Sequence, residues 1–96
     1  MAIIELLPIG KENRISQRDL MRLAGIRDPR ALRAAIHRER CAGNLILATT
    51  ESGGGYYRHA NQTELRDWLN RNEGQAKAIF ATLKAARHEL QSAERV

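Results

Sequence analysis

The sequence predicts a mainly helical fold with one small β-hairpin and a long C-terminal helix. Two segments with helix-capping residues flank Gly25, and residues 44–59 are rich in β-branched residues, glycine and tyrosine. Apolar residues then recur at heptad spacing as far as Leu90. The chain has 96 residues, of which 43% are hydrophobic and 28% charged, so its composition is that of a folded protein rather than of a disordered one.

The first two helices are expected to be short. Four apolar residues near the N-terminus have the spacing of one helical face: Ile3, Ile4, Leu6 and Leu7. Residues 10–15 are polar and predict a loop. Ser16 is expected to cap a helix that ends at Ala24, with Leu20, Leu23 and Ala24 on one face and Gly25 in the left-handed conformation. Ile26 should then return to the core.

A longer helix and a hairpin follow. Asp28 as N-cap and Pro29 as first helical residue predict a helix that runs to about Ala42 and stops at Gly43. At 100° per residue its inner side carries Leu32, Ala35, Ile36 and Glu39. Residues 44–49 and 56–59 predict two short strands joined by a turn at residues 51–55. One of the two tyrosines should pack under this hairpin against Ile46.

The C-terminal segment has the pattern of a long helix that begins with a capping box at Asn61–Glu64. Eight positions alternate in spacings of four and three residues: Leu65, Leu69, Asn72, Ala76, Ile79, Leu83, Ala86 and Leu90. Such a seam favours pairing with the same helix of a second chain, and its expected homodimer interface consists of Leu69, Ala76, Ile79, Leu83 and Leu90. The alternative is that the first turns pack on the chain's own domain and the helix folds back at Gly74.

Positive charge is concentrated in one segment. The net charge is +5, and residues 10–40 carry nine basic and four acidic side chains, which accounts for the whole excess. Eight of these nine cations are arginines, the side chain best suited to paired contacts with phosphate or guanine. The segment therefore predicts either a nucleic-acid interface or an arginine-rich solvated surface.

The order of these elements carries a resemblance to a known family. The motifs Ser16-Gln17-Arg18-Asp19-Leu20, Leu23-Ala24-Gly25-Ile26, Asp28-Pro29-Arg30 and Gly54-Gly55-Tyr56-Tyr57 resemble a winged helix-turn-helix, in particular the small winged-helix proteins of phages and prophages of Gram-positive bacteria. The resemblance covers residues 1–60 and leaves residues 61–96 as a separate helix. It implies sequence-specific binding of double-stranded DNA by a transcriptional regulator or accessory factor. It also favours Tyr56 as the tyrosine under the hairpin.

The candidate contacts follow from the outer side of helix 28–42, which would enter the major groove. Arg30, Arg33 and His37 are the candidates for base contacts. The candidates for phosphate contacts are Ser16, Arg18, Arg22 and Arg27, and Arg58 in the wing could reach a backbone or the minor groove. For each single arginine, an exposed side chain or a weak surface ion pair is an equal alternative. The turn alone also accounts for Gly53–Gly55.

Other classes of function are less favoured. His37 and Cys41 have metal-ligand spacing, but two ligands fall short of a zinc site, and no catalytic constellation is evident. No enzyme activity, cofactor, metal or small-molecule ligand is therefore expected. One cysteine and the lack of a long apolar run favour a cytoplasmic protein without a membrane partner. The main alternative is a winged-helix protein–protein adaptor that uses the C-terminal helix; RNA binding is weaker, because few aromatics remain for base stacking.

Overall fold

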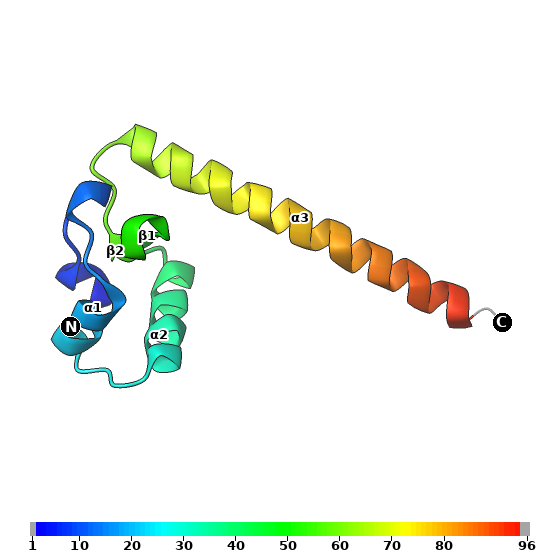
Figure 1. Cartoon of the computed structure of the whole chain (residues 1–96), viewed down its shortest axis with the longest axis horizontal. Coiled ribbons are helices and arrows are strands. Elements are labelled where there is room, and N and C mark those ends of the chain that lie inside the picture. Colours follow the sequence, from blue (N-terminus) through cyan, green and yellow to red (C-terminus); the bar gives the residue numbers. More distant parts are fainter. Residues whose placement is uncertain (1, 95–96) are drawn as a thin grey trace. The chain divides into compact units, whose positions relative to one another are not determined.

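The computed structural model describes residues 2–94. They form two short α-helices, two β-strands, three 3₁₀ helices and one long C-terminal α-helix (Figure 1). The α-helices and strands are α1 (Gln17–Ala24), α2 (Pro29–Cys41), β1 (Leu47–Thr49), β2 (Gly55–Tyr57) and α3 (Gln62–Glu94). The 3₁₀ helices span Ile3–Leu6, Lys11–Asn13 and Glu51–Gly53. The chain divides into two compact units, with the boundary between Leu65 and Arg66. The mainly helical fold with an antiparallel hairpin and a long C-terminal helix is thus confirmed.

Helix α1 begins and ends as its sequence predicts. The Asp19 backbone N–H donates to Oγ of Ser16 at 3.1 Å, which makes Ser16 the N-cap. Gly25 has φ 70° and ψ 26°, and the N–H of Ile26 donates to the Met21 carbonyl oxygen at 3.0 Å. These are the features of a Schellman turn, which favours glycine because a left-handed residue with a Cβ is strained. Ile26 returns to pack against the core, as expected.

The face that α1 buries differs from the expectation. Leu20 is fully buried and Met21 packs partly against the core, whereas Leu23 is 59% exposed. The inner stripe therefore follows the i, i+3, i+4, i+7 positions that start at Gln17, and Leu23 lies outside it. The prediction that Leu23 shares the core face was wrong, because the helix rotates to bring Met21 inward.

Helix α2 is fixed by its cap and by two buried leucine and isoleucine side chains. The Arg30 backbone N–H donates to Oδ1 of Asp28 at 3.1 Å, and Leu32 and Ile36 are 0% and 2% exposed. They join a core cluster that the helices and the hairpin share: Ile3, Leu7, Leu20, Leu32, Ile36 and Ile46. The predicted inner side of α2 is therefore confirmed.

Glu39, also on the inner side of α2, holds the N-terminal segment. Its two carboxylate oxygens accept the backbone N–H groups of Ile3 at 2.6 Å and of Ile4 at 3.1 Å. These are the first amides of a 3₁₀ helix, whose N–H groups have no partner within the helix. A half-buried carboxylate and two otherwise unpaired amides thus satisfy one another across 35 residues of sequence.

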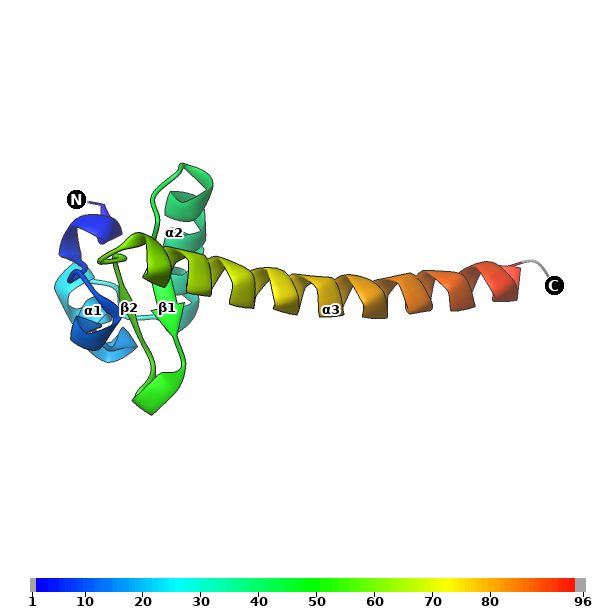
Figure 2. The same ribbon diagram turned by 90° about the horizontal axis from the view of Figure 1, so that it is seen from above.

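Strands β1 and β2 form an antiparallel hairpin (Figure 2). In its register Leu47 pairs with Tyr57 and Ala48 with Tyr56. Tyr56 packs partly buried against the core cluster that contains Ile46, which confirms the expected role. Tyr57 is 1% exposed, so both tyrosines are covered, one on each face of the hairpin. Strand β1 is shorter than the expected 44–49, because residues 44–46 form a tight turn after α2.

Residues 10–15 were expected to form a loop, but they contain a 3₁₀ helix at Lys11–Asn13 and a backbone pairing at Ile15. Ile15 and Tyr56 exchange two backbone hydrogen bonds, at 2.9 Å and 2.8 Å, so Ile15 forms an isolated antiparallel bridge to β2 at the edge of the hairpin. Gly55 has φ 153°, and a Cβ at this position would lie 2.8 Å from the Ile15 carbonyl oxygen. The close approach of the two backbones therefore requires glycine here. Polar composition predicted a loop because the pairing uses only main-chain groups.

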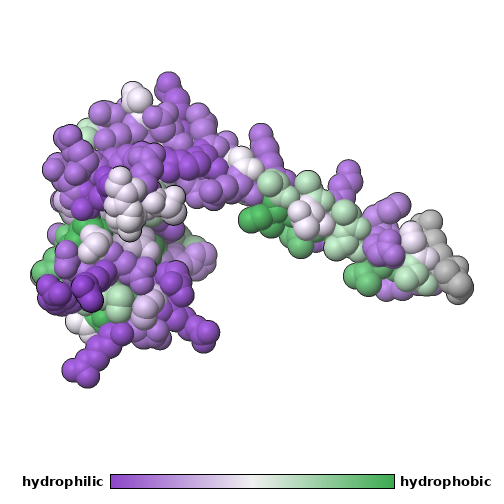
Figure 3. Space-filling view, viewed as in Figure 1, coloured by the Kyte–Doolittle hydropathy of each residue, from purple (hydrophilic) through white to green (hydrophobic). Residues whose placement is uncertain are grey.

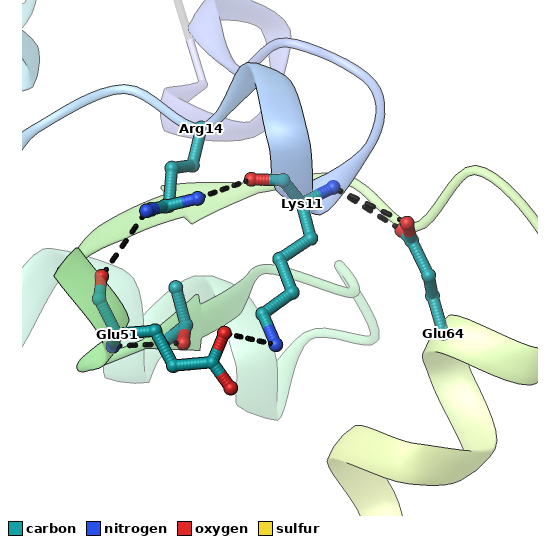
Figure 4. Close-up of polar contacts among 5 residues, drawn as sticks. Lys11, Arg14, Glu51 and Glu64 are labelled. Carbon is teal, nitrogen blue, oxygen red and sulfur yellow. Dashed lines mark hydrogen bonds and ion pairs between the residues drawn. The ribbon is translucent and has the colours of Figure 1, made fainter.

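A network of polar contacts fixes this segment further (Figure 4). Arg14 donates to the carbonyl oxygens of Lys11 at 3.0 Å and Glu51 at 3.2 Å, while Nζ of Lys11 lies 2.8 Å from Oε2 of Glu51. The Lys11 backbone N–H also reaches the carboxylate of Glu64, which in turn accepts the N–H of Ala60 at 3.0 Å. Within the first unit, the side chain of Glu64 thereby connects the first turn of α3 to the segment that begins at Lys11, and it accepts two backbone N–H groups.

Helix α3 runs from Gln62 to Glu94 without a break at Gly74. Its N-cap is Asn61, whose Oδ1 accepts the Glu64 backbone N–H at 3.0 Å. The expected alternative of a fold-back at Gly74 is wrong, since a single glycine costs about 1 kcal/mol in a helix and does not by itself end one. None of the described residues of α3 is buried.

Candidate nucleic-acid interface

Five arginines lie on α1, on the turn that follows it and on the start of α2. They are Arg18, Arg22, Arg27, Arg30 and Arg33, and all five are exposed. We call this set the arginine surface. It consists of residues that the sequence analysis selected as DNA contacts, and all of them belong to the first unit of the chain.

The core positions of α2 determine which side chains face outward. Leu32 and Ile36 anchor one side of the helix, so Arg30, Arg33 and His37 lie on the other side, and all three are exposed. Ala34 is also exposed and lies between Arg30 and His37 on that side. A small residue at the centre of a basic helix face allows a partner to approach the backbone closely.

Little negative charge neutralises the arginine surface. Arg22 pairs with Asp19 at 3.6 Å, and with both side chains more than half exposed this ion pair contributes little stability. Within residues 2–94, no carboxylate lies at salt-bridge distance from the other four arginines. The side chain of Asp28 accepts the Arg30 backbone N–H, so it serves as a cap. The surface therefore keeps most of its positive potential for a partner.

Ser16 lies at the N-terminus of α1 and is exposed. Its Oγ accepts the Asp19 N–H, and a hydroxyl that accepts one hydrogen bond retains its own O–H as a donor. The position is thus chemically able to donate to a phosphate oxygen beside Arg18. The structure gives it a capping role as well, so its substitution would affect both the helix and any contact.

Arg58, the predicted contact in the wing, is held inside the fold. It is half-buried, its Nε donates to the Leu7 carbonyl oxygen at 3.0 Å, and its backbone groups pair with Pro8 and Gly10. These contacts assign the Arg58 guanidinium a structural role between the N-terminal segment and β2. The sequence analysis expected Arg58 in the wing to reach a DNA backbone or the minor groove, because its pairing with residues 8–10 has no local sequence pattern.

Arg40 is a second arginine with a structural role. Its Nε donates to the Ile46 carbonyl oxygen at 2.8 Å, which ties the end of α2 to the entrance of β1. Desolvation by burial lowers the pKa of Arg40, and the charge of Tyr56 acts in the opposite direction. Together with Arg14, which bonds two carbonyl oxygens, these residues show that part of the basic segment supports the fold. Composition alone does not separate these arginines from the exposed ones.

His37 and Cys41 lie one turn apart on α2, with 3.6 Å between Nε2 and Sγ. In residues 2–94 no group of three or more histidine, cysteine, aspartate or glutamate side chains is arranged to hold a metal ion. None of the described helices is long and apolar enough to cross a membrane.

The predicted interface residues on α3 form an exposed apolar stripe. Leu69 and Leu83 are each 46% exposed, and Ile79 and Leu90 exceed 60%. Ala76 is exposed as well, and Phe80, beside the seam, is 68% exposed. Figure 3 shows apolar side chains gathered along α3 between polar ones. Many large apolar side chains in one row are unusual for a surface without a partner.

The sequence analysis missed Arg38 as a member of the outward side. It is exposed near the end of α2, one residue after His37, and it has no ion pair within the described part of the chain. At 100° per residue Arg38 lies away from Leu32 and Ile36, and this periodicity is the available indication. Glu39 was placed correctly on the inner side, but its partners at the N-terminus have no local signature.

Comparison with known proteins found no significantly similar protein. No protein-family model matches the chain, and neither a curated protein nor a solved structure is significantly similar to it.

Proposed function

We propose that the first unit of the chain is a winged helix-turn-helix domain that binds double-stranded DNA sequence-specifically. The order of elements supports this fold: a paired segment at Ile15, then α1, a Schellman turn, α2 and a hairpin whose β2 also pairs with Ile15. The hairpin would be the wing. The resemblance to phage and prophage winged-helix proteins favours a transcriptional regulator or an accessory factor of a mobile element.

In this proposal α2 enters the major groove with its N-terminus leading. Arg30 and Arg33 reach guanine edges, where a bidentate arginine contact is the commonest specific one, and His37 lies one turn further along. Arg18, Arg22 and Arg27 contact phosphates on either side of the groove and fix the position of the helix. Ser16 donates its hydroxyl hydrogen to the same backbone. Arg58 is not assigned a DNA contact in this proposal, because its half-buried side chain donates Nε–H to the Leu7 carbonyl oxygen.

The observation that carries the proposal is the uncompensated charge of the arginine surface. Five exposed arginines lie on two consecutive helices and the turn between them, and Arg22 alone has an acidic partner within residues 2–94. A duplex presents a phosphate charge about every 1.7 Å of its axis, so such a surface gains several contacts at once.

The direct test is binding of duplex DNA by fluorescence anisotropy, first with a random pool and then with selected sites. If Arg18, Arg22 and Arg27 each neutralise a phosphate, the logarithm of the affinity falls with the logarithm of salt with a slope of about −2.7. The variant Arg30→Ala/Arg33→Ala should bind selected sites on the order of a hundredfold more weakly, at about 1–3 kcal/mol per lost guanine contact. Lys77→Ala/Lys84→Ala is the matched control, because it removes two exposed cations from α3.

The proposal fails if the wild-type protein does not bind duplex DNA at low salt. It also fails if the arginine variant and the lysine control lose affinity equally, because the charge would then act without regard to its position. Circular dichroism of each variant checks that α1 and α2 remain folded. The selected sites show whether half-sites are repeated, which a dimeric protein would favour.

Self-association through α3 is the second part of the proposal. The exposed stripe of Leu69, Ala76, Ile79, Leu83 and Leu90 supports it, since a second α3 would cover these side chains. Leu83→Asp introduces a charge in the middle of the stripe and should convert the protein from dimer to monomer in multi-angle light scattering. A wild-type mass equal to that of one chain contradicts the dimer.

The same stripe supports a second candidate function, a winged-helix adaptor that binds another protein through α3. In that case the arginine surface serves solubility, and DNA affinity is undetectable at low salt. Leu83→Asp would then abolish partner binding, whereas Arg30→Ala/Arg33→Ala would leave it intact. These two variants therefore separate the adaptor from the DNA-binding protein.

A further inference from the structure

We propose that α3 pairs with α3 of a second copy in antiparallel orientation, about a twofold axis close to Phe80. This inference rests on the self-association proposed above and is independent of DNA binding. It concerns the relative direction of the two helices. The apolar stripe alone does not determine this direction, because leucine and alanine side chains can pack against each other in both parallel and antiparallel pairs.

The heptad seam assigns each residue of α3 a position relative to the partner. The seam continues from Leu69 through Ala76 and Leu83 to Leu90, with Asn72, Ile79 and Ala86 between them. The row on one flank of this seam, at position e of the heptad, consists of Arg66, Glu73, Phe80, Arg87 and Glu94. The row on the other flank, at position g, consists of Trp68, Gln75, Thr82 and Glu89.

The charges of the e row are reversed about Phe80. Before Phe80 the row reads positive then negative, and after it again positive then negative. In an antiparallel pair the e row of one helix faces the e row of the other. Rotation about Phe80 therefore brings Arg66 to Glu94 of the partner subunit and Glu73 to Arg87 of the partner subunit, and it places the two Phe80 rings beside each other.

Each of these ion pairs occurs twice in a symmetric dimer, so the arrangement contains four attractive contacts. Two like-charged pairs are out of register by about two turns: Arg66 with Arg87 of the partner subunit, and Glu73 with Glu94 of the partner subunit. Each of these repulsions occurs twice. The balance remains favourable, because the oppositely charged residues face each other directly, whereas the like charges are about 10 Å further along the helix, where salt screens exposed charges.

A parallel pair has the opposite charge balance. There, a g residue faces the e residue five positions later in the other helix. The four facing pairs would be Trp68 with Glu73, Gln75 with Phe80, Thr82 with Arg87 and Glu89 with Glu94. None of them joins opposite charges, and the last joins two carboxylates, twice per dimer. Electrostatics therefore favours the antiparallel direction.

One residue of the seam, Asn72, favours a parallel pair, but a hydrogen bond within its own helix weakens that preference. Two Asn72 side chains would face each other in a parallel dimer and could exchange hydrogen bonds. In the structure, Nδ2 of Asn72 donates to the Trp68 carbonyl oxygen of its own helix at 2.8 Å. The amide therefore has a partner without a second Asn72, and an apolar neighbour across the seam leaves less of it unsatisfied.

The side chains that the pairing requires are available. Ile79, Phe80 and Leu90 are each more than 60% exposed, and no described residue of α3 is buried. Within residues 2–94, Arg66, Glu73, Arg87 and Glu94 have no ion pair in a single chain. A second copy would thus cover the apolar stripe and supply partners for these four charges together.

Charge exchange tests the direction of the helices. Glu73→Arg and Arg87→Glu should each raise the dimer dissociation constant about tenfold or more, since each turns two attractive contacts into repulsive ones. The double variant Glu73→Arg/Arg87→Glu should restore the wild-type constant, because it recreates both ion pairs with reversed sign. Glu73 and Arg87 lie four turns apart in one helix, so a single chain offers no route to this rescue. Sedimentation equilibrium gives the constants.

The matched control is Lys84→Glu, which reverses the same charge on the side of α3 away from the seam and should leave the dissociation constant within about twofold. Failure of the double variant to recover dimerisation overturns the proposal. Circular dichroism of the variants distinguishes a lost dimer from an unfolded chain.

A distance measurement gives a second, independent outcome. A spin label on Gln91→Cys, in a Cys41→Ser background, lies on the outer side of α3 and leaves the seam unchanged. An antiparallel pair centred near Phe80 separates the two labels by roughly 30–40 Å, whereas a parallel pair holds them within roughly 20 Å. The shorter distance overturns the antiparallel proposal while self-association stands. A monomeric wild-type chain overturns both, and the DNA-binding measurement remains unaffected.

Discussion

The contact between Glu39 and the N-terminal segment predicts a large effect of one substitution on stability. Glu39→Ala removes the acceptor of the Ile3 and Ile4 backbone N–H groups, which lie at 2.6 Å and 3.1 Å. Hydrogen bonds to charged groups contribute about 1.5–3 kcal/mol each when their partners are buried. Ile3 is 5% exposed, so its amide would be left without water, whereas the amide of Ile4 is less covered.

The expected loss in the free energy of unfolding is therefore about 2–3 kcal/mol, close to the value for the Ile3 contact with a smaller addition from Ile4. Removal of a negative charge near the C-terminus of α2 returns roughly 0.3 kcal/mol, because the helix dipole disfavours that charge. For a domain of this size the melting temperature should fall by roughly 10–20 °C. Glu39→Gln retains one carbonyl acceptor and should lose about half as much.

Urea unfolding at fixed protein concentration, followed by the near-ultraviolet signal of the tyrosines, measures this loss. Tyr57 is buried in the first unit, so its signal reports on that unit rather than on α3. Glu12→Ala is the matched control, because Glu12 is an exposed glutamate and its loss should change stability by less than about 0.5 kcal/mol. A Glu39→Ala variant as stable as this control would refute the proposed role of the carboxylate.

Two further predictions concern the segment that pairs with the hairpin. Arg58→Met should lower the free energy of unfolding by about 1–2 kcal/mol through loss of the bond to the Leu7 carbonyl oxygen, while DNA affinity of the folded protein, measured by anisotropy, should stay within about threefold because no phosphate contact is lost. Gly55→Ala should destabilise more than Gly53→Ala in urea unfolding, since both have positive φ but only Gly55 would place its Cβ 2.8 Å from the Ile15 carbonyl oxygen. Equal losses would contradict the close approach.

Local chemistry in the sequence predicted the helices of the first unit well. Ser16, Gly25 and Asp28 act through residues at most five positions away, so their capping roles can be recognised without the fold. The inner side of α2 also follows from periodicity alone. Leu23 was misplaced because α1 is only two turns long and several rotations give it an apolar face.

Contacts between distant main-chain groups could not be predicted in the same way. Ile15 pairs with Tyr56 through backbone atoms, and Nε of Arg58 donates to the Leu7 carbonyl oxygen. The main-chain partners in these contacts are groups that every residue type carries. Glu39 gave a partial indication, since a carboxylate on an inner side must find donors. Its donors are amides of Ile3 and Ile4, and no side-chain pattern marks them in advance.

The division of the arginines into two groups decides what the basic segment can do. Arg14, Arg40 and Arg58 donate to carbonyl oxygens and are half-buried, so they are part of the fold's support. The members of the arginine surface are exposed and, except for Arg22, have no acidic partner in residues 2–94. Arg30 and Arg33 are exposed and are not part of the buried side of α2, so their substitution tests binding without disturbing the core. Solubility alone does not require the exposed arginines to be concentrated on two consecutive helices and the turn between them. This placement is therefore the strongest physical argument for a polyanionic partner.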